Sequence, residues 1–212
     1  MATAREISEG EQAALARLQE LAGERDADAR EALRHLRNVL SVVRSLAQRT
    51  GDETESVEEF RAVFDGRLAA LARVQTAVGR DTRAGKDLGA IIGDELLAFG
   101  VGVGEGVELS GRPVRLAPRA AGLVALAVHE LAGDFATRGE CGPVRVSWTA
   151  EDGLDIDWVT PTDGDGCSAR ALPDWVGRAI AYELRGEVIE DGANGERRRR
   201  IRLPGNCYVA TG

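Results

Sequence analysis

The stretch 33-LRHLRNVLSVVRSLA-47 repeats apolar residues at steps of three and four, which is the spacing of one face of an amphipathic α-helix. Gly51 and Asp52 end this pattern, and Ser56 precedes Glu59 by three residues, as in a helix-capping box. A second helical stripe follows, made of Phe60, Phe64, Leu68, Leu71, Val74 and Val78. The two helices, joined by about ten residues, are predicted to fold back as an antiparallel hairpin.

Each helix of this hairpin has a single apolar stripe. One hairpin alone leaves part of both stripes in water, whereas two copies bury them in a four-helix bundle, so we expect a homodimer. Upstream, residues 13–21 hold a shorter apolar stripe and residues 24–31 are mostly charged. We therefore divide this region of the chain into a helical extension, residues 1–29, and a hairpin domain, residues 30–82.

The pattern changes after the polar segment 79–85. Residues 86–207 combine helices with short, mostly antiparallel strands, which predicts an α+β fold in which helices pack on a sheet. The first two strands are expected to form a short hairpin around Ser110-Gly111. The predicted helices are 88–99, 117–137 and 173–184, and the predicted strands are 107–109, 114–116, 144–149, 154–159, 187–190 and 198–203.

The composition restricts the classes of partner. Thirty-five acidic residues against 27 basic ones give a net charge of -8, which argues against a nucleic-acid binder. The run Arg197 to Arg200 is interpreted as the exposed edge of a last strand. We expect no membrane insertion, since no stretch approaches about 20 apolar residues. Three cysteines without a CxxC pair argue against a disulfide framework or a zinc site and favour the cytoplasm.

Four segments resemble motifs of the HWE and closely related sensor histidine kinases. Residues 33–43 resemble the H-box, and residues 60–73 resemble that family's Phe-x-x-Arg-Leu-x-Ala-Leu-x-Arg helix. Residues 128–134, VHELAGD, resemble its nucleotide box, and residues 179–188 resemble its closing helix and strand. The likeness covers residues 30–204 in the right order. It implies a dimerisation and histidine phosphotransfer hairpin at 30–82, followed by a GHKL-like, ATPase-like α/β sandwich at 86–207.

The H-box departs from the family's pattern at the position that carries the phosphoryl group. Aligning Asn38 and Leu40 with the H-box places Arg34, not His35, at the phosphoacceptor position. His35 follows one residue later, about 100° around the helix. His35 is nevertheless the candidate phosphoacceptor, with Arg34, Arg37 and Asn38 as its neighbours. The alternative is an ordinary surface histidine.

The nucleotide-binding motifs depart from the pattern as well. The nucleotide-box Asn, which the resemblance assigns to Mg²⁺, is replaced by Asp134, and the Glu after Trp158 is replaced by Thr160. Acidic residues surround Gly164 and Gly166, where a phosphate needs bare backbone donors. The candidate nucleotide-binding residues are His129, Glu130, Asp134, Trp158, Gly164 and Gly166, with Asp134 as the candidate Mg²⁺ ligand.

Each of these residues also has a structural interpretation. His129 fits a residue packed between helix and sheet, and Trp158 fits the sheet core. Glu130 fits either a general base or a solvated charge, and Asp134 fits either a Mg²⁺ ligand or a helix-end carboxylate. Sequence alone does not choose between these alternatives.

Three functions remain open. The first is a degenerate histidine-kinase-like protein that acts as a histidine phosphotransferase, or as a regulator that docks response-regulator receiver domains in a phosphorelay. The second is an active histidine kinase that autophosphorylates with ATP and Mg²⁺. The third is a non-catalytic dimeric scaffold that sequesters a signalling partner. The changed chemical positions favour the first, with ATP-dependent activity weakened or lost, and leave open whether the chain is an enzyme.

Overall fold

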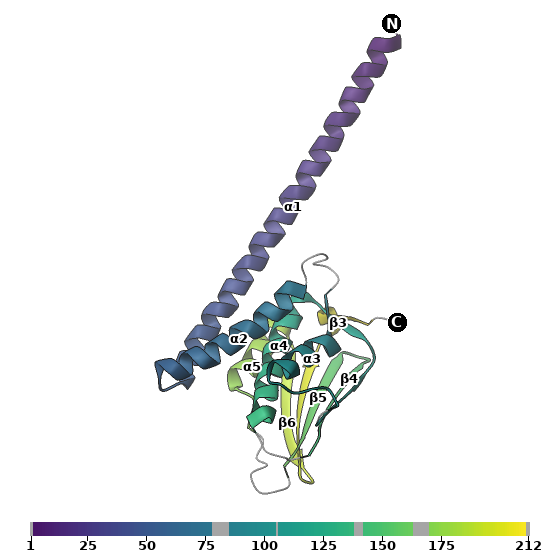
Figure 1. The fold of residues 1–212 in the computed structure, drawn as a ribbon. Coiled ribbons are helices and arrows are strands. Elements are labelled where there is room, and N and C mark those ends of the chain that lie inside the picture. Colours follow the sequence, from purple (N-terminus) through teal and green to yellow (C-terminus); the bar gives the residue numbers. More distant parts are fainter. Residues whose placement is uncertain (1, 78–84, 105, 138–141, 163–169, 211–212) are drawn as a thin grey trace. The chain divides into compact units, whose positions relative to one another are not determined.

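The computed structural model describes residues 2–77, 85–104, 106–137, 142–162 and 170–210 (Figure 1). The chain divides into two compact units, Met1–Glu55 and Ser56–Gly212. The first unit is the helix α1, Ala2–Glu53. The second holds every other described element, including α2, Val57–Ala77. Both helices of the predicted hairpin therefore exist, while their antiparallel pairing stays a prediction.

Helix α1 is continuous over 52 residues. The charged stretch 24–31 does not interrupt it, because this stretch consists of Glu, Arg, Ala and Asp, of which the first three form helices well. Residues 54–56 separate α1 from α2, a shorter connection than the sequence pattern indicated. The predicted cap of α2 is present: the Glu59 N–H donates to Ser56 Oγ at 3.1 Å.

The second unit contains two sheets. The larger has strand order β2-β4-β5-β7-β6, and its neighbours are antiparallel except for the parallel pair β2 and β4. The smaller has order β1-β3-β8. The strands are β1 Lys86–Asp87, β2 Val107–Gly111, β3 Val114–Leu116, β4 Val144–Ala150, β5 Leu154–Pro161, β6 Glu187–Ala193, β7 Glu196–Leu203 and β8 Tyr208–Ala210.

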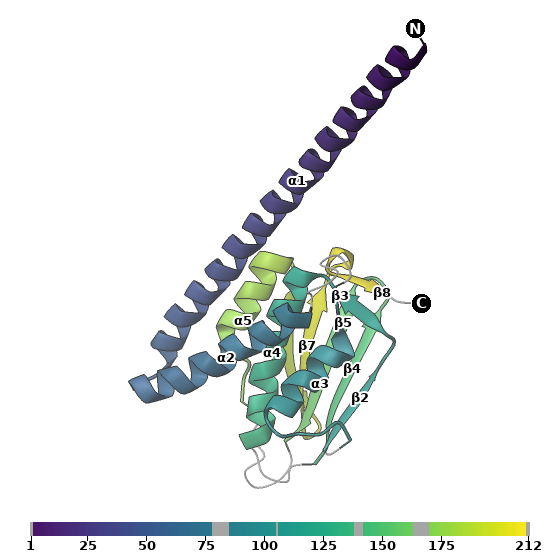
Figure 2. The same cartoon turned by 45° about the horizontal axis from the view of Figure 1, so that its top comes forward.

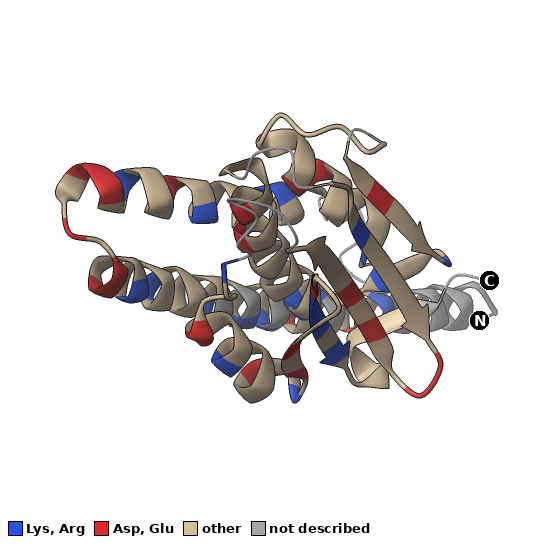
Figure 3. Ribbon diagram, turned by 90° about the horizontal axis from the view of Figure 1, so that it is seen from below, with Lys and Arg blue, Asp and Glu red and all other residues tan. Residues whose placement is uncertain are grey.

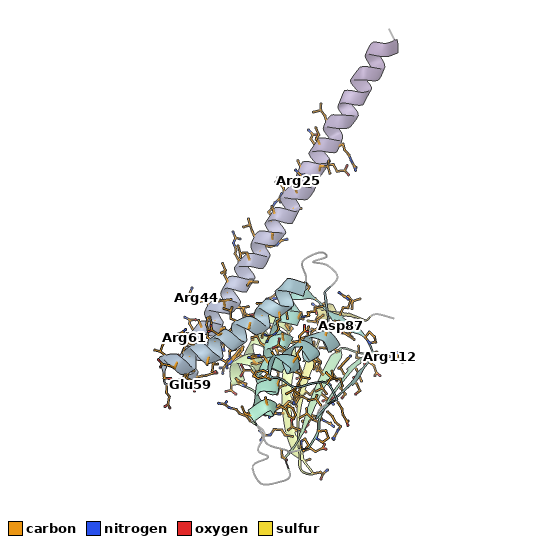
Figure 4. All side chains as sticks on the ribbon, viewed as in Figure 1. Arg25, Arg44, Glu59, Arg61, Asp87 and Arg112 are labelled. Carbon is orange, nitrogen blue, oxygen red and sulfur yellow. The ribbon has the colours of Figure 1, made fainter. Side chains whose placement is uncertain are left out.

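Helices cover one face of the larger sheet (Figures 1 and 2). Asp87 caps α3 by accepting from the Ala90 N–H (Figure 4). The predicted helix 173–184 is α-helical to residue 179 and continues as a π-helical turn. The helices of the second unit after α2 are α3 Leu88–Ala98, α4 Pro118–Thr137, α5 Asp174–Ala179, η1 Ile180–Leu184 and the 3₁₀ turn η2 Gly205–Cys207.

Helix α4 is the centre of the core. Most of its residues from Ala120 to Val128 are fully buried, and it packs against α2, α3 and α5. By length and composition α4 is apolar enough to cross a membrane, but most of it lies inside the second unit. Its apolar character is therefore explained by its place in the core.

Two predictions about the strands are wrong. β2 and β3 do not form a hairpin around Ser110-Gly111, since β2 pairs with β4 and β3 pairs with β1 and β8. The arginine-rich strand is not at the edge, because β6 follows it there. An Asn194-Gly195 turn with positive φ at both residues folds β6 back onto β7, which leaves β7 between β5 and β6.

The arginines of β7 alternate between the two faces of the sheet. Arg200 and Arg202 point to the face without helices, where each makes two hydrogen bonds to a carboxylate of β5, Asp157 and Asp155 respectively. Figure 3 shows these acidic and basic strands side by side. Arg199 points to the helix-covered face and is 1% exposed. The arginine run is thus an ion-pair ladder plus one buried cation.

Candidate functional site

Helix α4 carries three of the predicted site residues, His129, Glu130 and Asp134. Successive helical residues point about 100° apart, so each of the three meets a different neighbour. Glu130 faces α2, His129 faces α3 and α2, and Asp134 faces β7. The structure therefore gives the nucleotide-box residues partners on three separate elements.

Glu130 forms an ion pair with Arg67 of α2. The Arg67 Nε donates to Glu130 Oε1 at 2.6 Å, and the Arg67 side chain is 3% exposed. The guanidinium also lies over the ring of Trp175 on α5, 5.0 Å from its centroid. Glu130 is thus neither a solvated charge nor a free general base, because a buried arginine holds its carboxylate.

His129 belongs to a second network, centred on Glu95 of α3. Arg73 of α2 donates to both carboxylate oxygens of Glu95, at 2.9 and 2.5 Å. His129 Nδ1 lies 3.1 Å from Glu95 Oε2, and the ring of Phe99 packs on the imidazole. The expectation that His129 packs between helix and sheet is therefore corrected: it packs between helices.

The pKa of Glu95 reflects this network. Burial alone would raise the pKa of this carboxyl, because it penalises the charged form. Hydrogen bonds from His129 and Arg73, together with the charges of both, outweigh burial and lower the pKa below its ordinary value of 4.5. The Arg73 pKa is raised, with the hydrogen bond to Glu95 as the largest cause. Both partners are held in their charged forms.

Asp134 has partners on both carboxylate oxygens. The Arg170 N–H donates to Oδ1 at 3.1 Å, and Arg199 Nη2 lies 3.6 Å from Oδ2. Arg199 Nη1 also donates to Thr160 Oγ1 at 3.2 Å, and Arg199 Nη2 donates to the carbonyl oxygen of Arg170. Asp134 and Thr160 are two of the positions at which the sequence departs from the family's nucleotide motifs. Both therefore contact the same buried arginine.

This arrangement does not fit Mg²⁺ and a nucleoside triphosphate. A Mg²⁺ ligand needs an available carboxylate oxygen, and Asp134 would have to leave Arg199 to provide one. The departure would leave a guanidinium without its carboxylate in a buried position, which is costly. Within the described regions of the chain, no group of three or more His, Cys, Asp and Glu side chains is placed to hold a metal ion.

The remaining predicted residues are not brought to this site. Trp158 is buried in the sheet core, as its structural interpretation predicted. Arg34 and Arg37 are exposed on α1. The side chains of His35 and Asn38, and the whole of Gly164 and Gly166, lie outside the described residues. Their roles stay predictions.

Arg67, Arg73, Glu95 and Arg199 were missed as site residues. Arg67 and Arg73 are the two arginines of the family-like helix motif, and that motif could have indicated them. Glu95 is a charge inside the apolar stretch 88-LGAIIGDELLAF-99, a pattern that predicts a buried ion pair. Arg199 alternates with outward-facing arginines, so the period of a strand indicates its inward direction.

The Glu95 network predicts an acid-dependent stability. Its carboxyl has a lowered pKa when folded, so its stabilising effect is complete above the unfolded pKa and is lost as pH falls through the folded pKa. Glu95→Gln should therefore lower the free energy of unfolding at neutral pH and make its decline below about pH 4 shallower than in the wild type. Urea unfolding across this range measures both effects. Equal slopes for the two proteins would contradict the prediction.

Residues 31–113 match the family model described as HWE histidine kinase. Blue-light-activated histidine kinase 1 of Erythrobacter litoralis is 30% identical over 136 residues, which make up 60% of this chain and 37% of that protein. The solved EL346 blue-light-activated histidine kinase of Erythrobacter litoralis has the same fold, with a TM-score of 0.55 at 17% identity, over 81% of this chain and 59% of that one. The chain thus spans less than two thirds of either protein. The predicted α+β fold is confirmed, and the chain is a homologue of the HWE histidine kinases.

Proposed function

We propose that this histidine-kinase homologue is a two-component signalling protein that transfers or regulates phosphoryl groups without using ATP. It would act as a histidine phosphotransferase, or as a regulator that docks a response-regulator receiver domain. One observation carries the proposal: Arg199 contacts two of the positions at which the nucleotide motifs changed, Asp134 and Thr160. The ATPase-like fold is kept, while a buried cation takes the place of metal and phosphate chemistry.

A second observation supports the same proposal. Glu130, the nucleotide-box carboxylate that a kinase would offer as a base, is held by Arg67 at 2.6 Å. This carboxylate would have to break its hydrogen bond to Arg67 before it could take a proton from another group. Proton abstraction at this position is therefore disfavoured as well as metal binding.

Nucleotide binding is the most direct test. Binding of ATP with Mg²⁺ should be weak or absent, because Asp134 must exchange Arg199 for the metal. Isothermal titration calorimetry of the wild-type chain measures this affinity. Micromolar affinity, about -8 kcal/mol, would overturn the proposal and favour the active kinase.

The proposal includes a homodimer. Among the described side chains of α1, Leu33, Leu36 and Leu40 are exposed, as is Leu68 on α2. Exposed leucines at helical spacing are typical of a surface that another helix covers, and a second copy of the hairpin supplies matching helices. The dimer would place two α1 helices in one bundle.

Light scattering tests the dimer. The wild type should have twice the mass of one chain, and Leu40→Asp should be monomeric, because a charge without a partner in a bundle core is strongly unfavourable. Ser41→Asp, also exposed on α1, is the matched control and should stay dimeric. A wild type that is monomeric at every concentration would contradict the prediction.

The phosphoryl group is expected on His35. A phosphorylated receiver domain should pass its label to the wild type, and the label should be labile in acid, as phosphohistidine is. His35→Ala should take up no label and keep its dimer, since alanine is a better helix former than histidine. Arg34 and Arg37 would assist by neutralising phosphoryl oxygens.

The outcomes of this transfer experiment separate the three functions. Ser41→Ala removes a nearby hydroxyl and should label as the wild type does. If the wild type takes up label from the receiver domain but not from ATP, the result supports the phosphotransferase. Label from ATP supports the active kinase. A wild type that takes up label from neither source, or a His35→Ala variant that labels equally, supports the scaffold.

We also propose that the chain acts in the cytoplasm without membrane insertion, as the composition and the buried position of α4 favour.

A further inference from the structure

Helix α2 contacts the ATPase-like region of the chain through two arginines. Arg67 and Arg73 are six residues apart and reach carboxylates on two different helices, Glu130 on α4 and Glu95 on α3. Glu95 is 1% exposed, and Arg67 is 3% exposed. One partner of each pair is therefore removed from water, while Glu130 is 17% and Arg73 30% exposed. In the pair of Arg145 and Glu196 both side chains are exposed.

Small and apolar residues allow α2 and α4 to approach closely. A Cβ at Gly66 would lie 3.0 Å from His129 Nε2, so a side chain at this position would crowd the imidazole. A Cβ at Gly122 of α4 would lie 3.5 Å from Leu71 Cδ2. Ala70 and Val74 are fully buried. The two ion pairs thus flank an apolar seam rather than join two solvated surfaces.

A lysine adds a further contact at the C-terminal end of α2. Lys86 Nζ lies 2.8 Å from Asp94 Oδ2 and donates to the carbonyl oxygen of Arg73 at 3.4 Å. Lys86 and Asp94 come from β1 and α3, the elements that follow α2. The backbone of α2 is thus held at the same residue whose side chain holds Glu95.

We propose that Arg67 and Arg73 form a conformational latch that joins α2 and the ATPase-like region into a single rigid body and keeps Glu130 out of nucleotide chemistry. We call the two pairs, Arg67 with Glu130 and Arg73 with Glu95 and His129, the α2–α4 latch. It joins two segments that the sequence presents as separate motifs, the arginine helix and the nucleotide box. A movement of α2 then carries α4 with it, so the nucleotide box follows the position of the hairpin helix.

The latch is independent of the proposed phosphotransfer. It depends on contacts inside the second unit, and it holds whether or not His35 accepts a phosphoryl group. Removing one partner leaves the other charged and buried, whereas exchanging the two charges keeps the attraction. This difference separates a pairwise latch from a general contribution to folding.

Hydrogen exchange with mass spectrometry tests the latch on the full chain. Arg67→Glu and Glu130→Arg should each speed the exchange of amides in 57–77 by about tenfold or more, because α2 opens locally from α4. The double variant Arg67→Glu/Glu130→Arg should return the exchange to within about threefold of the wild type. Peptides from 144–161 report whether the sheet stays folded.

Arg61→Glu is the matched control. Arg61 is exposed on the same helix, before Arg67 in the sequence (Figure 4), and this variant should exchange as the wild type does. If the single charge reversals also unfold the sheet, the neutral variants Arg67→Gln and Glu130→Gln replace them. In the double neutral variant, the increase in exchange should then differ from the sum of the two single effects. Unchanged exchange in the single variants, or a double variant that is no better than the singles, would overturn the proposal.

Discussion

Glu95 is a carboxylate at 1% exposure in a helix that is otherwise mostly apolar, and such a group needs a cation beside it. The only cation with two hydrogen bonds to it in the described structure belongs to Arg73, on another helix. The position of α2 is therefore fixed by the requirement of a charge in α3. The apolar seam of Ala70, Leu71 and Val74 adds area, but it sets no register along α4 by itself. The Arg67–Glu130 pair and the close approach of Gly66 to His129 together set which turn of α2 meets which turn of α4.

The same requirement applies to Asp134 of α4. An asparagine at position 134 needs no cation, whereas a carboxylate there needs one, and Arg199 on the neighbouring strand provides it. The shorter Thr160 leaves a hydroxyl that accepts from the same guanidinium. Each change alone would leave a polar group in need of a partner. In this chain both groups contact Arg199, Asp134 through an ion pair at 3.6 Å and Thr160 through a hydrogen bond at 3.2 Å.

The sequence predicted what depends on local spacing. Apolar residues that recur every 3.6 residues predict α2 and α4, and those that recur every second residue predict β4 and β5, in each case to within a few residues. The spacing of Ser56 and Glu59 predicts the cap of α2. Partners distant in the sequence were not predicted. Only Arg112 and Pro113 separate β2 from β3, yet the two strands join different sheets, because their pairing is decided by strands further along the chain. The same limit applies to the site, since the sequence identifies Glu130 as a candidate but not its partner Arg67, which is 63 residues away.

Two kinds of arginine in this chain illustrate why burial decides their roles. Arg200 and Arg202 bind carboxylates in two-bonded geometry on the open sheet face, where water and salt screen the charges, so each pair contributes little to stability. Arg67 and Arg199 are themselves buried, and Arg73, although 30% exposed, pairs with a carboxylate that is 1% exposed, so water screens these charges less. Replacing one partner of such a pair lowers the stability strongly, because it leaves the other charge buried and unpaired. Exchanging the two charged residues keeps the pair. Ion pairs of the same residue types therefore hold helices together where a partner is buried, and add little stability on the open face of the sheet.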